Sequence, residues 1–338
     1  DENYLEKINR IIKENIILEK YNWDSSEISW DFQANSCIIH GDKLIKDALE
    51  KSLNVDKENF KKIKANEDEL NAIYNTILNV NNTINSNIEE ELITYSINTK
   101  TEFIKDLISY AVGCMFGRYS LDENGLIYAG GNFDENRYKK FKADSDNIIP
   151  ITDEAYFDDD IVQRFKQFIE VAFGKEKLNE NIDFIAETLE KKGTETSEET
   201  IRRYFVNDFF NDHVKMYQKR PIYWLLDSGK KNGFKALVYM HRYNENLIPK
   251  ARLDYLHRIQ TTYEKLLFDV NYKLTTDLSM LDKKDAQKRQ ADLNAKLQEI
   301  KEYDEKIAHI ANQRISIDLD DGVKVNYEKF KDILAKIK

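Results

Sequence analysis

Residues 220–242 read RPIYWLLDSGKKNGFKALVYMHR, and this stretch decides how the middle of the chain folds. Two apolar runs, residues 222–226 and 234–240, are rich in aromatic and β-branched side chains. The segment between them, residues 228–233, contains two glycines and two lysines. Runs of this kind joined by a short glycine-containing loop are typical of an antiparallel hairpin, so the sequence predicts two paired strands with a basic tip.

The charge around this hairpin is opposite in sign to that of the rest of the chain. Residues 201–265 contain thirteen Lys or Arg and six Asp or Glu, a formal net charge of +7, whereas the whole chain carries −10. A basic region with interleaved aromatic side chains on an acidic protein is typical of a surface that docks a polyanion. The alternative is a solvated hairpin on an acidic protein, because lysine and arginine often cluster around loops.

The whole chain is predicted to have a predominantly helical α+β fold. Only three prolines and eleven glycines interrupt 338 residues, and apolar side chains recur at helical spacing. Residues 1–98 are predicted to form a helical spacer, residues 99–250 a mixed α/β domain with the hairpin, and residues 251–338 a C-terminal part. Within the last, two long helices are expected to fold back as an antiparallel coiled pair, followed by a small hairpin at residues 315–325 and a cap helix.

Two pairs of residues mark predicted helix starts. Thr99 with Glu102, and Thr196 with Glu199, have the spacing of a capping box. Helices are predicted over residues 42–53, 57–80, 87–97, 158–173, 177–189 and 198–217, and short strands over residues 125–131 and 147–151. Three aromatic residues break the helical pattern of the first part and are expected to pack against other side chains: Trp23, Trp30 and Phe32.

Composition also bears on the compartment. No apolar run approaches the about 20 residues that a membrane span needs, and the chain starts without a basic and apolar leader, so a cytoplasmic protein without membrane contact is predicted. Cys37 and Cys114 lack partners at metal spacing, and both are expected to be buried thiols rather than a disulfide or zinc site. Because the chain begins with Asp1 inside a helical pattern, we expect a piece of a longer protein.

Motifs for several kinds of chemistry are missing from the sequence. It has no glycine-rich cofactor loop after a strand, no Asn/Asp-Pro-Pro-aromatic motif, no phosphate-binding loop and no nucleophile elbow. His213 with Asp208 and Asp212 is the one cluster of histidine and carboxylates, and on a helix His213 would point about 100° away from the two aspartates. We therefore expect no catalytic, cofactor-binding or metal-binding residue in this chain.

Four runs carry a resemblance to a known family. They are ISYAVGCMFGRYSLDENGLIYAGG (residues 108–131), IIPITDEAYFDDDIVQRF (148–165), NDFFNDHVKMYQKRPIYWLLDSGKKNGFKALVYMHRY (207–243) and IDLDDGVKVNYEKF (317–330). They resemble the C-terminal half of the PglX family, the adenine-specific DNA methyltransferases of BREX phage-exclusion systems. WDSSEISWDF at residues 23–32 is similar to the segment that follows the family's catalytic domain.

The resemblance implies a function and a set of partners. In the parent protein, an upstream domain that is missing here would use S-adenosylmethionine to methylate N6 of adenine and mark host DNA. This half would recognise the target in double-stranded DNA, next to the catalytic domain of the same chain and other BREX proteins. The resemblance therefore implies that the present chain alone neither binds S-adenosylmethionine nor methylates DNA.

Individual DNA contacts are predicted from charge and placement, not from the resemblance. Phosphate contacts are predicted at Lys219, Lys230, Lys231, Lys235, Lys250 and Arg252. Candidates for reading base edges are Arg220, His241, Arg242, Arg118 and Tyr119. Two alternatives remain at this point: an interaction scaffold for other defence proteins whose basic region is incidental, and a hydrolase built on the His213 cluster, which the helical spacing disfavours.

Overall fold

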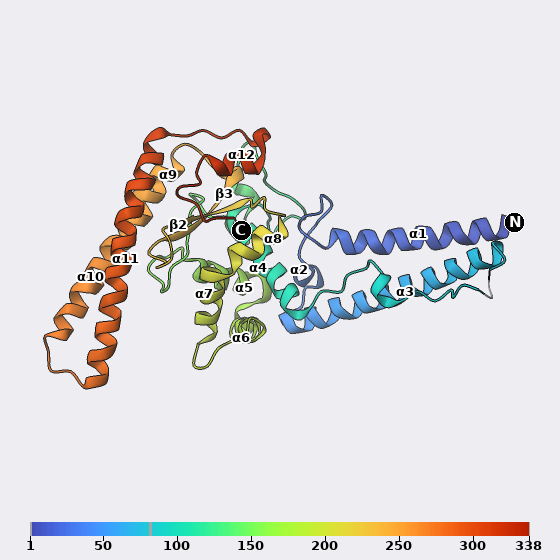
Figure 1. The fold of residues 1–338 in the computed structure, drawn as a ribbon, viewed down its shortest axis with the longest axis horizontal. Helices are drawn as coiled ribbons and strands as arrows, with labels where there is room; N and C mark the ends of the chain where they lie inside the picture. Colours follow the sequence, from blue (N-terminus) through green and yellow to red (C-terminus); the bar gives the residue numbers. More distant parts are fainter. Residues whose placement is uncertain (1, 81–82, 338) are drawn as a thin grey trace.

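The computed structural model describes residues 2–80 and 83–337, which form a central body between two helical arms (Figure 1). The first arm pairs α1 (Glu2–Asp24) with α3 (Ile45–Ile77), and the second pairs α10 (His257–Leu274) with α11 (Met280–Gln313). The body contains a small antiparallel sheet surrounded by helices. The predicted class, a predominantly helical α+β fold, is confirmed, and so is the predicted pair of C-terminal helices.

The first arm has a small apolar seam of its own. Ile8 and Ile11 of α1 pack against Ile73 of α3. The short α2 (Ser36–His40) joins the arm to the body, and α3 runs without the predicted interruption after residue 53.

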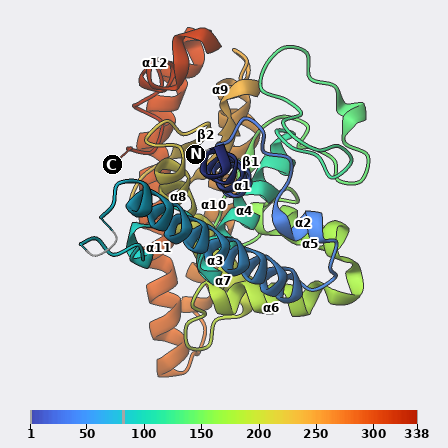
Figure 2. The ribbon, with the colours of Figure 1, turned by 90° about the vertical axis from the view of Figure 1, so that its right-hand side faces the viewer.

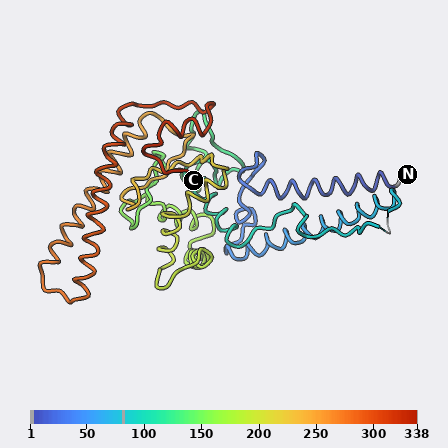
Figure 3. Tube along the Cα trace, in the orientation of Figure 1, coloured from blue at the N-terminus to red at the C-terminus, as the bar shows by residue number. Residues whose placement is uncertain are grey.

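After α3 the chain returns along the arm in an extended conformation (Figure 3). The predicted helix over residues 87–97 is wrong, because the structure has only the 3₁₀ turn Glu90–Leu92 there. Polar side chains of α3 hold the extended backbone instead: Asp68 accepts a hydrogen bond from the Ile88 amide at 2.6 Å, and Asn71 donates to the Ser86 carbonyl at 3.2 Å.

The body is built around α4 (Lys100–Phe116), most of whose residues are buried. Its predicted capping box is confirmed, since the Thr99 hydroxyl accepts from the Glu102 amide at 3.2 Å and Glu102 accepts from the Thr99 amide at 2.9 Å. The helix ends at Gly117, whose φ of 77° is the left-handed conformation that glycine adopts readily.

Four further helices belong to the body: α5 (Ile161–Phe173), α6 (Leu178–Thr188), α7 (Ser197–Asn207) and α8 (Phe209–Met216). The capping box at Thr196 and Glu199 is confirmed at the start of α7. One continuous helix over residues 198–217 is wrong, because the backbone breaks at Asp208 with φ −118°. After the break, Phe209, Phe210 and His213 are buried.

The predicted hairpin is confirmed as β2 (Tyr223–Asp227) and β3 (Lys235–Tyr239), which are antiparallel with Tyr223 opposite Tyr239. A third strand, β1 (Ile149–Pro150), pairs with β3 and gives the order β1-β3-β2. This confirms the strand predicted near residue 149, where Pro150 occupies an edge strand that tolerates its missing N–H.

The predicted strand over residues 125–131 is wrong, since these residues lie in the long loop between α4 and β1. Figure 2 shows this loop standing out from the body. Gly125, Gly130 and Gly131 all have positive φ there, which interrupts a regular strand.

The end of the chain returns from the second arm to the outer edge of β2. The small hairpin predicted at residues 315–325 is wrong, because the 3₁₀ turn Leu319–Asp321 leads into the helix α12 (Gly322–Glu328). Beyond it the Ala335 amide donates to the Leu225 carbonyl at 2.8 Å, and the Asp227 amide donates to the Ile333 carbonyl at 3.2 Å. The C-terminal segment therefore covers a strand edge that would otherwise be unpaired.

α9 (Leu247–Lys250) and a π-helical turn (Ala251–Leu256) connect β3 to the second arm. Among the described residues, no helix is both long enough and apolar enough to cross a membrane. Cys37 and Cys114 are buried free thiols, as predicted.

Candidate nucleic-acid interface

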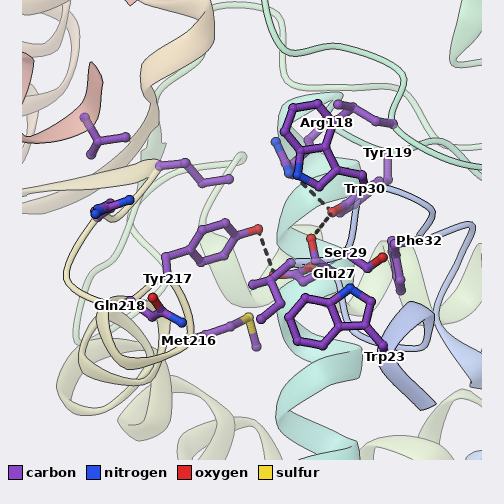
Figure 4. A pocket seen from close by; sticks show the side chains of 15 residues that line it. Trp23, Glu27, Ser29, Trp30, Phe32, Arg118, Tyr119, Met216, Tyr217 and Gln218 are labelled. Carbon is purple, nitrogen blue, oxygen red and sulfur yellow. Dashed lines mark hydrogen bonds between the residues drawn. The ribbon is translucent and has the colours of Figure 1, made fainter. Parts of the chain in front are cut away.

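A pocket of about 520 Å³ lies where the first arm meets the body (Figure 4). Its walls come from the end of α1 and the segment after it, from the residues that follow α4, and from the turn between α8 and β2. We call it the aromatic pocket, and the lining residues used below are Trp23, Glu27, Trp30, Arg118, Tyr119, Tyr217 and Arg220.

Glu27 is the buried acid of the aromatic pocket, with an exposed fraction of 7%. Its Oε1 accepts hydrogen bonds from the hydroxyl of Ser109 and, at 3.3 Å, from that of Tyr217. Its Oε2 is buried and has no hydrogen-bond partner among the described residues. Burial raises the pKa of Glu27, and the Ser109 hydrogen bond and the charge of Arg118 oppose that rise.

Arg118 is the cation of the aromatic pocket, directly after the left-handed Gly117 that ends α4. Its Nε donates to the Tyr119 hydroxyl at 3.1 Å and its Nη1 donates to the Tyr239 hydroxyl at 3.2 Å. Tyr119, the other predicted base reader at this point of the chain, is buried at 2% exposure, and its hydroxyl orients the guanidinium of Arg118 (Figure 4). No carboxylate of the described residues lies within ion-pair distance of Arg118.

Exposed aromatic side chains form the rim of the aromatic pocket. Trp30 is fully exposed and Trp23 is 58% exposed, so the prediction that all three aromatics of this segment pack is wrong for Trp30. Phe32 does pack, at 5% exposure, against the rings of Tyr110 and Tyr119. The residues around Trp30 and Phe32 show no helical or strand periodicity. The sequence therefore could not predict that Trp30 is exposed and Phe32 is buried.

A second hollow lies at the other end of the hairpin. This groove of about 660 Å³ is bordered by the hairpin tip, α8, α11 and the C-terminal segment. Two aspartates, Asp227 and Asp332, also line it. We call it the lysine groove after five lining residues: Lys230, Lys235, Lys306, Lys331 and Lys336.

The sequence prediction missed three of these lysines, Lys306, Lys331 and Lys336. They belong to the C-terminal part, and only the return of the chain to β2 brings them beside the hairpin. All three are exposed, and Lys306 and Lys336 form no ion pair with another described residue. Lys331 pairs with Glu328.

The hairpin tip is held on α11 by one carboxylate, Glu299. It accepts hydrogen bonds from the Ser228 hydroxyl at 2.7 Å, the Lys231 amide at 2.8 Å and the Gly233 amide at 3.0 Å. The side chains of Lys230 and Lys231 remain exposed, and neither forms an ion pair with a described residue. The backbone of the predicted basic tip is therefore fixed by Glu299, while its two lysine side chains extend into solvent.

Three predicted phosphate contacts have protein partners in this structure. Lys235 is 8% exposed, its Nζ donates to a backbone carbonyl of α7 at 2.9 Å, and burial lowers its pKa. Arg252 makes a bidentate pair with Asp304 at 2.7 and 2.8 Å, and Lys250 lies 3.1 Å from Asp146. Lys235 in particular is turned inward, because its strand position faces the helices of the body.

Two further predicted base readers are half-buried. Arg242 donates to the carbonyls of Phe116 and Asp144 at 3.2 and 2.8 Å, and its guanidinium lies 3.8 Å from the ring centre of Phe133. His241 is half-buried, and burial together with the charge of Arg118 lowers its pKa to about 4. Lys219 and Arg220 are exposed at the start of the hairpin, and Arg220 lines the aromatic pocket.

His213 supports the backbone at the same end of the hairpin. Its Nε2 accepts hydrogen bonds from the amides of Ile222 and Tyr223, both at 3.1 Å. Burial, and to a lesser degree the charge of Arg118, lowers the pKa of His213 to about 3. Asp212 instead pairs with Lys105 at 2.9 Å, and the described residues contain no group of histidine, cysteine and carboxylates fit to hold a metal ion.

The structure thus sorts the predicted residues into two groups at opposite ends of β2. Arg118, Tyr119 and Arg220 meet at the aromatic pocket, and Lys230 lies at the lysine groove. The chain is 40% identical, over 91% of its length, to the adenine-specific methyltransferase PglX of Lacticaseibacillus casei (strain Zhang). It is a relative of that methyltransferase.

A second comparison agrees with the first. The chain is 39% identical, over 99% of its length, to the adenine-specific methyltransferase BrxX of Escherichia coli O9:H4 (strain HS). The resemblance predicted from the sequence is therefore confirmed. The chain spans 26% of the length of PglX and 30% of that of BrxX, and no family model matches it.

Proposed function

We propose that this chain is the DNA-binding and target-recognition region of a site-specific adenine N6 methyltransferase that marks host DNA in a BREX-type defence system. The observation that carries the proposal is the placement of unpaired lysines at one end of the hairpin and of candidate base readers at the other. The names of the two methyltransferases to which the chain is similar supply the reaction.

Adenine methylation needs a separate grip on the duplex. The N6 amino group can be reached only when the base leaves the stack, so another part of the enzyme must hold the DNA and select the site. Lysine contacts to phosphates set position and supply affinity, whereas side chains at base edges supply specificity. The lysine groove fits the first task, together with Lys219 and Lys231, and the exposed Arg220 fits the second.

The proposal narrows the predicted contact set. Lys235, Arg242 and Arg252 already have protein partners, so we place no direct DNA contact on them. We also propose that residues 99–250 act as the recognition unit, with residues 1–98 as a spacer and residues 251–338 as a C-terminal part that completes the lysine groove.

S-adenosylmethionine and the methyl transfer belong, in this proposal, to the rest of the parent protein. The sequence has neither a glycine-rich cofactor loop after a strand nor an Asn/Asp-Pro-Pro-aromatic motif, so we expect no cofactor binding by this chain alone. The parent would act on double-stranded DNA in the cytoplasm, together with its own catalytic domain and other BREX proteins.

A scaffold role is the second candidate, favoured by exposed apolar side chains on both arms. Leu5 and Ile17 of α1 are 59% and 68% exposed, and Phe268 of α10 is 72% exposed. Apolar patches of this kind are typical of protein contacts. Salt separates the two candidates, because phosphate binding weakens steeply with ionic strength and apolar docking does not.

The proposal is tested by neutralising the lysine groove. Lys230, Lys306 and Lys336 are changed together to alanine, and affinity for several unrelated duplexes is measured across a range of salt concentrations. We expect weaker binding by a similar factor on every sequence, and a salt slope reduced by about one unit for each lysine that binds a phosphate in the wild type.

The matched control removes the same charge far from the groove. Lys283, Lys284 and Lys288 are exposed near the outer end of the second arm, and their triple alanine variant should bind DNA like the wild type. Equal effects of the two triple variants, or none from either, would refute a phosphate-binding groove.

Base readout is tested in the full-length parent. If Arg220 contacts a base edge, Arg220→Ala should cost about 1–3 kcal/mol on the correct site and much less on unrelated DNA. Methylation at the site would fall while the fold is kept, because the side chain is exposed. An unchanged preference for the correct site in this variant would mean that Arg220 does not contact a base edge.

A further inference from the structure

We propose that the aromatic pocket binds one unstacked nucleobase that carries an exocyclic amino group. The inference rests on the proposed function and gives the aromatic pocket a ligand class. Three features of the pocket support it: the buried acid, the half-buried cation and the exposed rim.

The acid provides an acceptor that the protein leaves unused. Both donors that reach the carboxylate of Glu27, from Ser109 and Tyr217, bind Oε1, while the buried Oε2 has no partner among the described residues. An unpaired buried carboxylate oxygen is costly, because desolvation is not offset by a hydrogen bond. An N–H donor from a ligand in the pocket would remove this cost.

The cation provides donors on the same pocket. A guanidinium has five N–H groups, and Arg118 uses one on Nε and one on Nη1 to reach the two tyrosine hydroxyls. Since those bonds fix the plane of the guanidinium, the remaining donors are oriented before any ligand arrives. A ligand with an acceptor beside its N–H donor would satisfy Arg118 and Glu27 together.

The rim provides stacking surfaces. Trp30 is fully exposed and Trp23 is 58% exposed, and both line the pocket (Figure 4). Bases stack on such rings with little dependence on sequence. A pocket of about 520 Å³ with an aromatic rim and few polar groups is also within the size and character of sites for small planar ligands.

These features together favour an amino-bearing base over other ligands. Adenine and cytosine each present an amino donor beside a ring acceptor, whereas thymine has no exocyclic amino group. A phosphate has no N–H donor to offer Glu27, and an apolar side chain from another protein would also leave Oε2 unpaired. Since a stacked base is enclosed by its neighbours, the base must be in a single strand or extruded from a duplex.

The test uses the whole chain and three fluorescent single strands, TTATT, TTCTT and TTTTT, followed by anisotropy. The strands carry the same phosphates, so a difference between them reports the central base. We expect TTATT or TTCTT to bind about tenfold more tightly than TTTTT, which is the scale of one good base contact. Equal affinity for all three, or no binding of any, overturns the proposal.

Two variants separate hydrogen bonding from stacking. Glu27→Gln replaces one acceptor oxygen by a donor and should remove most of the preference over TTTTT. Trp30→Ala should weaken all three strands by a similar factor, about tenfold, while the preference remains. Because Trp30 is fully exposed, its variant keeps the proposal testable even if Glu27→Gln impairs folding. If Trp30→Ala binds all three strands as tightly as the wild type, Trp30 does not stack on the bound base.

Controls distinguish this inference from the proposed function. Phe268→Ala removes an exposed ring from the second arm and should leave all three affinities unchanged. The triple lysine variant should alter salt dependence without altering the ratio of TTATT to TTTTT affinity. A ratio of one in the wild type, with weaker duplex binding by the triple variant, refutes the base pocket and keeps the groove. The reverse pattern refutes the groove alone.

Discussion

The two ends of the β2–β3 hairpin treat their charged groups in different ways. At the tip, Lys230 and Lys231 are exposed without ion-pair partners among the described residues, and one carboxylate, Glu299, fixes the backbone beneath them. At the opposite end, Arg118 is oriented by tyrosine hydroxyls and His213 fixes the start of β2. The lysines at the tip are exposed to solvent, whereas the polar groups at the other end are partly or fully buried and are oriented by hydrogen bonds.

This difference matches two kinds of nucleic-acid contact. Phosphates need charge rather than orientation, and exposed lysines supply that charge at little cost to folding. Base edges need donors and acceptors fixed in direction, which requires burial and a supporting network. In the proposed function, the hairpin therefore separates an end that would bind phosphates from an end that would bind a base.

The largest effect on stability is expected at Trp224, whose ring lies between the two ends of the hairpin. Trp224 is 1% exposed and packs against Phe330 and Tyr327 of the C-terminal segment at centroid distances of 5.4 and 5.8 Å. Trp224→Ala should lower the free energy of unfolding by about 3–5 kcal/mol, because a large buried ring leaves a cavity. Urea denaturation measures this loss.

The effect of Trp224→Ala should be uneven along the hairpin. The C-terminal segment supplies Lys331 and Lys336, so the lysine groove should loosen while the base preference of the aromatic pocket persists. Trp224→Phe is the control: the indole N–H has no partner among the described residues, so this change should cost much less than alanine. Simultaneous loss of both sites would mean that the two ends are not separable.

A smaller loss is expected at the tip. Glu299→Ala removes the acceptor for Ser228, Lys231 and Gly233, and should cost about 2 kcal/mol, since hydrogen bonds to a charged group are worth more than neutral ones. Faster hydrogen exchange at the Lys231 and Gly233 amides would report release of the tip. Glu302→Ala, an exposed position on the same helix, should leave both amides protected.

Acidification should lower the stability that His213 provides at the end of the hairpin opposite the tip. The pKa of His213 is about 3 in the folded chain, against an ordinary value near 6.5, so only the unfolded chain takes up this proton as the pH falls below about 6.5. The stability from the neutral ring is present above that pH and is lost toward pH 3. Between pH 7.5 and pH 5 the loss should be about 2 kcal/mol.

The control for this pH dependence is His213→Gln, which lacks the titrating group. Asp106 acts in the opposite direction, because burial and then the charges of Glu27 and Glu102 raise its pKa to about 7. The measured quantity is therefore the difference between wild type and variant in the pH dependence of the free energy of unfolding. If both chains lose the same stability on acidification, His213 does not govern this end.

Local patterns were sufficient to predict the hairpin and the paired helices of the second arm. Apolar runs on either side of a glycine-containing tip predicted β2 and β3, and the capping boxes predicted the starts of α4 and α7. Predictions failed where contacts between residues far apart in the sequence determine the local conformation. Examples are the extended segment held by Asp68 and the C-terminal residues paired with β2.

The same limit applies to the candidate site. Arg118, Tyr119 and Arg220 were selected from their local sequence, and the structure brings them together. Glu27 could not be found in this way, because its burial depends on Ser109 and Tyr217, which lie far along the chain. Lys306 and Lys336 were missed for the same reason, since nothing in the local sequence of α11 or of the C-terminal segment marks them as neighbours of the hairpin.

The smallest effect on stability is expected at Trp30, and it sharpens the contrast with Trp224. Trp30 is fully exposed, so Trp30→Ala should change the free energy of unfolding by less than about 0.5 kcal/mol. An exposed indole that contributes nothing to folding is available for a ligand, whereas Trp224 belongs to the core. A loss of several kcal/mol in urea denaturation would instead mean that Trp30 packs in solution and cannot form the rim of a base pocket.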